Sequence, residues 1–144
     1  MRKLVFAVLV AGLAGCAKTP SSDDCWSNEA KSAVGGEVKQ VFLDALRPVA
    51  EQHGEVFDDA ARKKYSDALT IGIDQAAVKD TAKQSVTCSA SATATMKNVK
   101  TGAEQSATFQ GVSYTIMSGE GGKFVYQVTN ADALRRVDSW REKQ

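Results

Sequence analysis

The sequence has few of the residues on which enzyme active sites and metal centres depend. It contains one histidine, His53, and three cysteines in 144 residues. The neighbours of His53 include Glu51 and Glu55, a pattern typical of a solvated loop, and no Ser, Thr or Cys stands in a recognisable nucleophile motif. The glycine-rich stretch 119–123 lacks the spacing of a phosphate-binding loop. The sequence therefore predicts no enzyme, no bound cofactor and no metal site.

An excess of one charge is also missing, and so is a long hydrophobic run. The 18 Lys and Arg residues balance 17 Asp and Glu, and without Arg2 and Lys3 the count is 16 against 17, a net charge near −1. This balance gives no electrostatic case for binding nucleic acid. The longest apolar run, Leu4 to Ala14, has eleven residues. As a helix it would be about 17 Å long, too short for a hydrocarbon core of about 30 Å.

The N-terminus combines a short basic start, this apolar run and the sequence Leu13-Ala14-Gly15-Cys16. The order resembles a bacterial lipoprotein signal with a lipobox for signal peptidase II. The resemblance implies cleavage before Cys16, lipidation of that cysteine and, because Ala17 is not Asp, sorting to the outer membrane. Two or three acyl chains would anchor the protein stably, whereas one would bind only marginally. The alternative is an ordinary secretory signal that ends at Ala14-Gly15.

Three segments follow from this interpretation. Residues 1–15 are the signal peptide, residues 16–24 comprise the lipidated cysteine and a tether, and residues 25–144 form a single α+β periplasmic domain. The tether assignment rests on Ala17 to Asp24, which is polar and has no periodicity, so we expect it to be flexible. Fully extended, eight residues reach at most about 28 Å. The domain would therefore stay near the periplasmic face of the membrane.

The two remaining cysteines are Cys25 and Cys88. In an oxidising periplasm such a pair favours a structural disulfide, which would stabilise the fold by about 4 kcal/mol in the chain-entropy model. The alternative is a redox or metal-binding pair. Redox motifs need cysteines close in sequence and a zinc site needs further ligands, so both features favour the disulfide.

Apolar residues spaced three or four apart predict a helix from Ser27 to Leu46. Gly35-Gly36 weakens its middle or permits close packing there. Pro48 disfavours helical geometry at the residue before it, so we expect a break or kink at that point. A second short helix is expected around residues 57–65, capped by Asp58 or Asp59.

After residue 65 the apolar period changes from 3.6 to 2, which predicts strands. They cover about residues 69–74, 86–96, 107–116 and 124–128, and a parity shift at Gly111 indicates a β-bulge in the third. The inward positions of the second strand are mostly alanine and include Cys88, so the disulfide would join the long helix to the sheet. A last helix is predicted from Ala131 to Glu142, with Leu134, Val137 and Trp140 facing inward. The predicted fold class is α+β: a long N-terminal helix packed on a roughly four-stranded antiparallel β-meander, with a short C-terminal helix.

Large aromatic and basic side chains are the best candidates for partner binding. Trp26 lies beside the predicted disulfide and Trp140 near the C-terminus; each could instead close the core. Arg135 and Arg136 could contact a partner or anionic headgroups, or simply face water. The hydroxyl residues that alternate from Thr87 to Thr95 are either solvated surface or a partner-binding sheet face.

The layout as a whole resembles a loosely defined group of small, disulfide-stapled bacterial lipoproteins. The features are the lipobox, a cysteine that opens an amphipathic helix, and a second cysteine in the run Thr87-Cys88-Ser89-Ala90. The resemblance implies a fold and a location and supplies no activity. The leading hypothesis is a non-enzymatic, outer-membrane-anchored lipoprotein that binds a periplasmic or outer-membrane protein in envelope assembly, immunity or exclusion, or inhibition. The alternative is a carrier of a small ligand or lipid between the sheet and the long helix.

Overall fold

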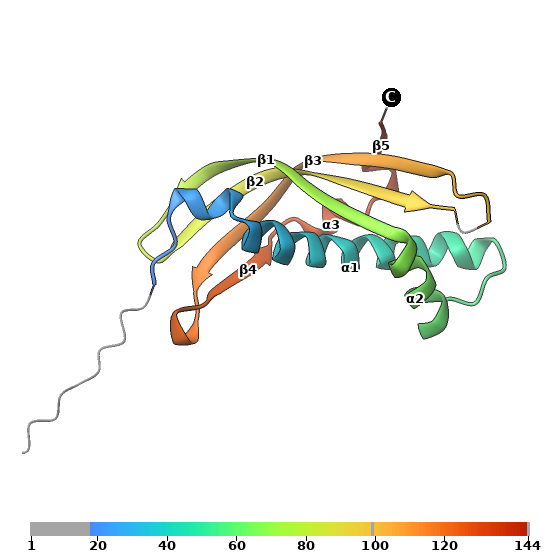
Figure 1. The fold of residues 1–144 in the computed structure, drawn as a ribbon, viewed down its shortest axis with the longest axis horizontal. Coiled ribbons are helices and arrows are strands. Elements are labelled where there is room, and N and C mark those ends of the chain that lie inside the picture. The colour runs from blue at the N-terminus through green and yellow to red at the C-terminus, as the bar shows by residue number, and fades with distance from the viewer. Residues whose placement is uncertain (1–17, 99, 144) are drawn as a thin grey trace, which may run out of the picture.

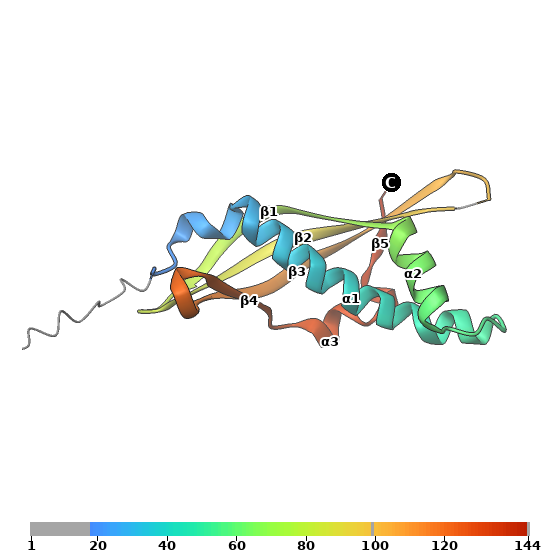
Figure 2. The same ribbon diagram turned by 60° about the horizontal axis from the view of Figure 1, so that its bottom comes forward.

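The structure, a computed structural model, describes residues 18–98 and 100–143. The predicted signal peptide and Cys16 lie outside the described residues. Four antiparallel strands follow one another in the sheet order β1-β2-β3-β4, and a short β5 pairs with β3. The sheet arches over the long helix α1, which runs along the longest axis of the molecule (Figures 1 and 2). The predicted α+β class is confirmed.

The elements occupy nearly the whole described chain. Their bounds are η1 Ser22–Trp26, α1 Asn28–Gln52, α2 Asp59–Ala68, β1 Leu69–Thr81, β2 Ser85–Lys97, β3 Glu104–Ser118, η2 Glu120–Gly122, β4 Phe124–Val128, α3 Ala131–Leu134, η3 Val137–Ser139 and β5 Arg141–Glu142. Side-chain caps begin both long helices as expected. The Ser27 hydroxyl accepts a bond from the Ala30 amide at 3.1 Å, and an Asp58 carboxylate oxygen accepts one from Ala61 at 2.8 Å.

Helix α1 does not break at Pro48, so of the break or kink predicted there the break is wrong. The helix continues through Pro48 to Gln52. Proline removes the amide that would bond to the carbonyl of Asp44, and both residues lie on the exposed face. Water can therefore satisfy that carbonyl, which lets the helix continue. Gly35 is buried against β1, where an added Cβ would lie 3.6 Å from Ile73 Cγ1, so the glycine pair does mark a close contact with the sheet.

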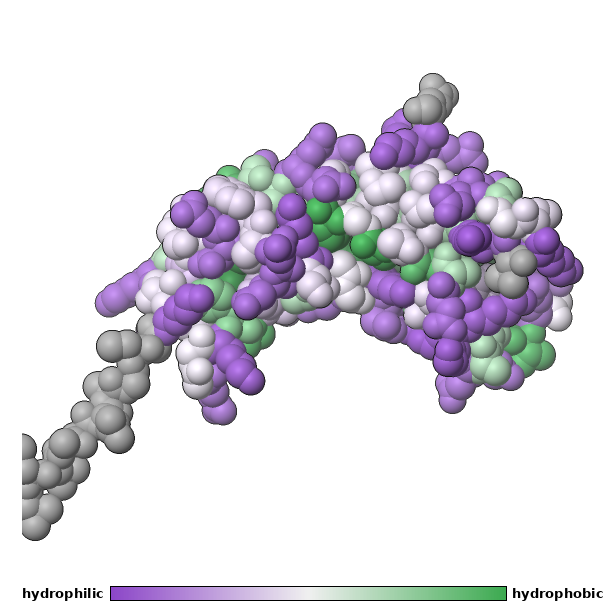
Figure 3. Space-filling view, in the orientation of Figure 1, coloured by the Kyte–Doolittle hydropathy of each residue, from purple (hydrophilic) through white to green (hydrophobic). Residues whose placement is uncertain are grey.

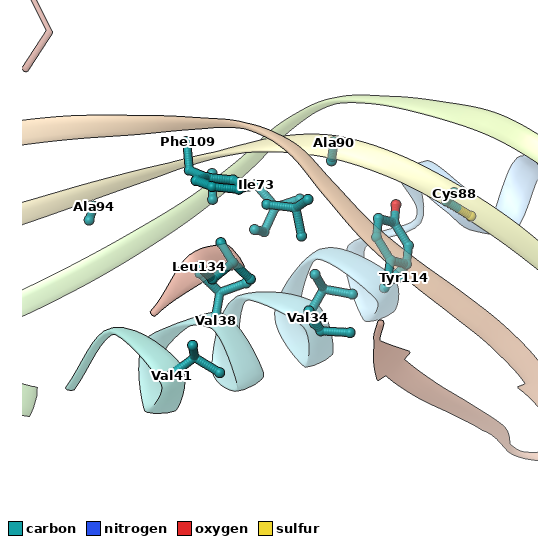
Figure 4. Packing of buried hydrophobic residues seen from close by; sticks show 14 of the residues in the cluster. Val34, Val38, Val41, Ile73, Cys88, Ala90, Ala94, Phe109, Tyr114 and Leu134 are labelled. Atoms are coloured by element: carbon teal, nitrogen blue, oxygen red, sulfur yellow. The ribbon is translucent and has the colours of Figure 1, made fainter. Parts of the chain in front are cut away.

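The core fills the space between α1 and the sheet. Val34, Val38 and Val41 point from the helix toward Ile73 and the small side chains of β2 (Figure 4). Phe109, Tyr114 and Leu134 close the same cluster from β3 and α3. The alanines of β2 at positions 90, 92 and 94 are all at most 4% exposed, as the alternation predicted. This packing occupies the space in which the carrier hypothesis placed a ligand.

The third strand contains the bulge predicted at Gly111. Ala90 pairs with Val112 and Ala92 with Phe109, so the two residues between on β3 face one on β2. Gly111 has φ of 80°, a conformation that favours glycine. Strand β1 is longer than predicted, and two further irregularities interrupt its register, between Asp74 and Ala77 and between Val78 and Asp80. Sequence alternation fails across such interruptions, which is why only residues 69–74 were recognised.

The C-terminal helix is much shorter than predicted. Helix α3 ends at Leu134, a 3-10 turn follows, and β5 pairs with Ala107 and Thr108 of β3. Side chains take the place of the backbone amides that a longer helix would supply as donors. The Ser139 hydroxyl donates to the carbonyl of Ala133 at 3.0 Å, and the Trp140 indole donates to the carbonyl of Leu134 at 2.9 Å. Val137, predicted to face inward, is consequently 44% exposed.

The segment assigned to a flexible tether is folded against the domain from Lys18 onward, which corrects that assignment. Residues 22–26 form η1, and at its start the amide and the hydroxyl of Ser21 both donate to a carboxylate oxygen of Asp24, at 2.7 and 3.2 Å. Pro20 is buried. The carbonyl of Lys18 accepts a hydrogen bond from the Ser118 hydroxyl at 2.9 Å. The bond between Ser118 and Lys18 joins residues 100 positions apart, so no local pattern indicates it.

Candidate functional site

A buried staple fixes the start of α1 to the sheet. Cys25 and Cys88 form a disulfide with Cα atoms 5.8 Å apart, which confirms the predicted pairing. The Tyr114 hydroxyl donates a hydrogen bond to the Cys25 carbonyl, and all three side chains are fully buried. Burial raises the pKa of Tyr114 to about 12, because the phenolate would lose its solvation. A covalent bond and a hydrogen bond therefore both hold η1 in place.

Trp26, the next residue, leaves this staple toward solvent. Its side chain is 46% exposed, so it does not close the core. The indole follows directly on the disulfide and ends η1, which packs against β1 and β2. An exposed tryptophan on a rigid base is a feature typical of contact surfaces, because a large apolar area is presented at little cost in conformational entropy.

Trp140 has the opposite environment and offers no binding surface. It is 8% exposed, and its ring lies edge-on to Phe42, with centroids 4.8 Å apart. A tilted contact with Phe109 at 5.7 Å completes the cluster. The bond from its indole nitrogen to the Leu134 carbonyl satisfies the only polar atom of the side chain. Of the two interpretations given for Trp140, core closure is the one that its position supports.

Arg135 and Arg136 are exposed but lie apart from Trp26. Arg135 forms an ion pair with Asp132 at 2.6 Å on the surface. Both arginines follow α3, which packs beside α1 near β4, whereas η1 packs on β1 at the other edge of the sheet (Figure 2). The structure therefore does not unite the predicted binding residues into one surface.

The hydroxyl residues of β2 form cross-strand pairs on the sheet face away from α1. Thr93 and Thr108 lie 3.3 Å apart and Thr95 and Ser106 lie 2.9 Å apart, measured between hydroxyl oxygens. These side chains are half-buried rather than freely solvated. Because their hydroxyls bond to one another, they stabilise the pairing of β2 with β3.

Two grooves flank the last turn of α2, at the end of the molecule opposite to Lys18 (Figure 1). The larger has a volume of about 720 Å³ and the smaller about 390 Å³. Both are lined by Lys64 and Ala68 of α2 and by Lys97 and Asn98 at the end of β2. The surface in Figure 3 is largely hydrophilic at this end, and its lower outline is hollowed between α2 and the β3–β4 hairpin.

The chain connection explains why these elements meet. Helix α2 runs directly into β1 at Leu69, and Leu69 pairs with Met96 near the end of β2. The last turn of α2 therefore lies beside the β2–β3 hairpin, which brings together lysines from distant parts of the sequence. We call Lys63, Lys64, Lys97 and Lys100 the lysine cluster. Sequence reasoning missed it because only the strand register places the two pairs side by side.

Acidic side chains surround the lysine cluster as well. Asp67 and Glu104 line the larger groove and Glu55 the smaller, and Glu104 lies opposite Lys97 in the pairing of β2 with β3. Lys63 pairs with Asp67 at 2.6 Å, and Glu55 accepts a bond from the Tyr65 hydroxyl at 2.5 Å, which raises the pKa of Tyr65. Within the described residues, the other three lysines of the cluster form no ion pair. The amines of such a surface can bind carboxylates or other anions.

No group of three or more His, Cys, Asp or Glu side chains in the described part of the chain is arranged to hold a metal ion. His53 caps the C-terminus of α1 and is exposed to solvent. No helix among the described residues is long and apolar enough to cross a membrane. Comparison of the chain with protein-family models, with curated proteins and with solved structures gave no match.

Proposed function

We propose that this protein is an outer-membrane lipoprotein, anchored through Cys16, whose periplasmic domain binds another protein at the lysine cluster. The observation that carries the binding site is the pair of grooves that meet at Lys64 and Ala68. Met96 and Tyr65, both half-buried, line the smaller groove, and lysines line both grooves. A protein segment with acidic side chains around a small apolar residue fits this combination.

Envelope assembly, immunity or exclusion, and inhibition are all compatible roles for such an anchored binding domain. The carrier alternative loses its original location, because the space between α1 and the sheet is filled by the core. The carrier alternative can still apply to the larger groove, as a site for a small anionic ligand. The groove's volume of about 720 Å³ lies within the range of ligand sites.

Photo-crosslinking in the native envelope tests the site. A photoreactive residue in place of Lys97 is expected to give one discrete adduct with a protein, and the same residue in place of Gln127 on β4 is not. Lys64→Glu is expected to abolish the adduct, whereas Lys79→Glu on β1 changes the charge equally and should leave it intact. An adduct that persists in Lys64→Glu, or none at Lys97, would overturn the proposed surface. Native mass spectrometry that shows a bound small molecule instead would support the carrier.

The anchor is tested separately. Cys16→Ser is expected to lose radiolabelled fatty acid and to leave the membrane fraction, because a single short apolar run does not hold a protein in the bilayer. If this variant remained membrane-bound and lipid-labelled, Cys16 would not be the anchor.

A further inference from the structure

Ser118 joins three segments at one end of the long axis. Its hydroxyl donates to the Lys18 carbonyl at 2.9 Å, and its amide donates to the carbonyl of Gln84 in the β1–β2 turn at 3.3 Å. Directly after it, Gly119 bonds to Lys123 at 2.7 Å and closes the β3–β4 hairpin. The start of the described chain, the β1–β2 turn and the β3–β4 hairpin therefore form one end of the domain (Figure 1), which we call the basal end.

Lys18 is held at the basal end by side-chain contacts as well. Its ammonium lies 4.7 Å from the centre of the Phe124 ring, and Pro20 is buried shortly after it. The start of the folded domain is thus fixed at Lys18 rather than at Cys25. If Cys16 carries the lipid, as proposed above, only Ala17 stands between the anchor and Lys18, and two Cα–Cα steps join them. That length spans at most about 7 Å.

This distance is similar to the thickness of one headgroup layer. The headgroups add about 10–15 Å in total to a hydrocarbon core of about 30 Å, which is roughly 5–8 Å on each side. A domain whose first fixed residue lies within about 7 Å of the Cα of Cys16 cannot move freely above the bilayer. We propose that the basal end rests on the bilayer surface and that the long axis points into the periplasm.

The side chains of the basal end fit the headgroup layer. The exposed indole of Trp26 belongs to η1 at this end, and indoles favour the boundary between lipid and water. Lys18, Lys83 and Lys123 are exposed there and can pair with phosphates. The acids Asp23 and Glu120 offset part of this charge, so the short connection, rather than net electrostatic attraction, sets the position.

This orientation sets the distance of the lysine cluster from the bilayer surface. Helix α1 has 25 residues and starts near the basal end, so it is about 37 Å long. The grooves beside α2 at its far end would face the periplasm, away from lipid. Trp26 accordingly serves the lipid surface, and the protein partner binds at the other end of the molecule. This inference rests on the proposed lipid anchor at Cys16.

Amide and indole NMR of the lipidated full-length protein in nanodiscs tests the orientation. The discs contain phosphatidylethanolamine and phosphatidylglycerol with a nitroxide-labelled headgroup. The protein has two indole N–H groups. The Trp26 signal is expected to lose most of its intensity, together with the amides of Lys83 and Gly121. The buried Trp140 and the amides of Lys64 and Lys97 should keep theirs.

A matched variant carries ten Gly and Ser residues inserted between Ala17 and Lys18. A flexible linker of that length has a root-mean-square reach of about 17 Å. The loss of Trp26 intensity should therefore fall to the level of Trp140. Equal broadening of both ends in the original protein, or an unaffected Trp26, would overturn the orientation while leaving the anchor intact. A protein without acyl chains on Cys16 by mass spectrometry would overturn the anchor and the orientation together.

Discussion

Replacement of both Cys25 and Cys88 by alanine measures how the start of α1 is fixed. The two cysteines are 63 residues apart, and the chain-entropy model assigns a loop of this length about 4 kcal/mol. Both side chains are fully buried, so truncation also removes contacts. Domains of this size are stable by only about 5–15 kcal/mol. We therefore expect the variant to lose a large fraction of its free energy of unfolding.

Urea unfolding of the lipid-free Cys16→Ser protein, followed by tryptophan fluorescence, provides the measurement. With a slope of about 1–3 kcal/mol per molar urea, a loss of about 4 kcal/mol lowers the midpoint by roughly 2 M. A control removes the second link: Tyr114→Phe leaves the buried Cys25 carbonyl without its donor, which costs about 1–3 kcal/mol.

The triple variant, which combines the two cysteine substitutions with Tyr114→Phe, shows whether the disulfide and the hydrogen bond stabilise the same segment or act separately. Once the disulfide is gone, η1 can separate from the sheet, and the bond from Tyr114 to Cys25 is then lost as well. The combined loss should therefore be smaller than the sum, with a coupling of about 0.5–3 kcal/mol. Strict additivity would refute the view that both links hold the same segment. A loss of less than about 1 kcal/mol on removing the disulfide would refute the entropic estimate itself.

Three other predictions concern single side chains. Burial raises the pKa of Tyr114 to about 12, and the pKa values of Tyr65 and Tyr126 are raised as well. The stability that these protonated tyrosines contribute is complete below pH 10 and should decline as the pH rises toward 12. A series of urea unfolding curves at different pH values should show a weaker decline for Tyr114→Phe. Gly36→Ala should stabilise the protein by about 0.5–1 kcal/mol, because nothing lies within 4 Å of the added Cβ in the helix interior. Gly119→Ala should destabilise it by roughly 1–3 kcal/mol, because its Cβ would lie 2.9 Å from a backbone oxygen; thermal unfolding measures both glycine variants.

Local pattern predicted the parts of the fold in which each side chain has a simple environment. The alternation of β2 identified its buried face and placed Cys88 on it, because apolar residues alternate with half-buried hydroxyl residues along most of the strand. The bulge at Gly111 was visible because it shifts the apolar parity by one residue. In both cases the information lies within about ten neighbouring residues.

The errors arose where distant partners override local preference. Pro48 remains within a helix because its missing bond faces solvent, which no local pattern reveals. The C-terminal segment has helical periodicity, yet β3 offers it an edge with which to pair, and the indole of Trp140 takes the carbonyl of Leu134. The lysine cluster was missed for the same reason, since it depends on the pairing of Leu69 with Met96.

The segment before Cys25 has the greatest functional consequence among these differences. Composition alone makes residues 17–24 a spacer, and a spacer of eight residues would allow the domain to explore about 28 Å above the bilayer. Ser118 holds Lys18 to the hairpin. With the lipid anchor proposed at Cys16, the same sequence would instead attach the domain at one end and leave about 7 Å of chain. A freely moving domain could present any face to a partner. A domain whose basal end rests on the bilayer would present α2 and the lysine cluster to the periplasm. The partner is therefore expected to be a periplasmic protein or a neighbouring envelope protein that reaches the same distance from the bilayer.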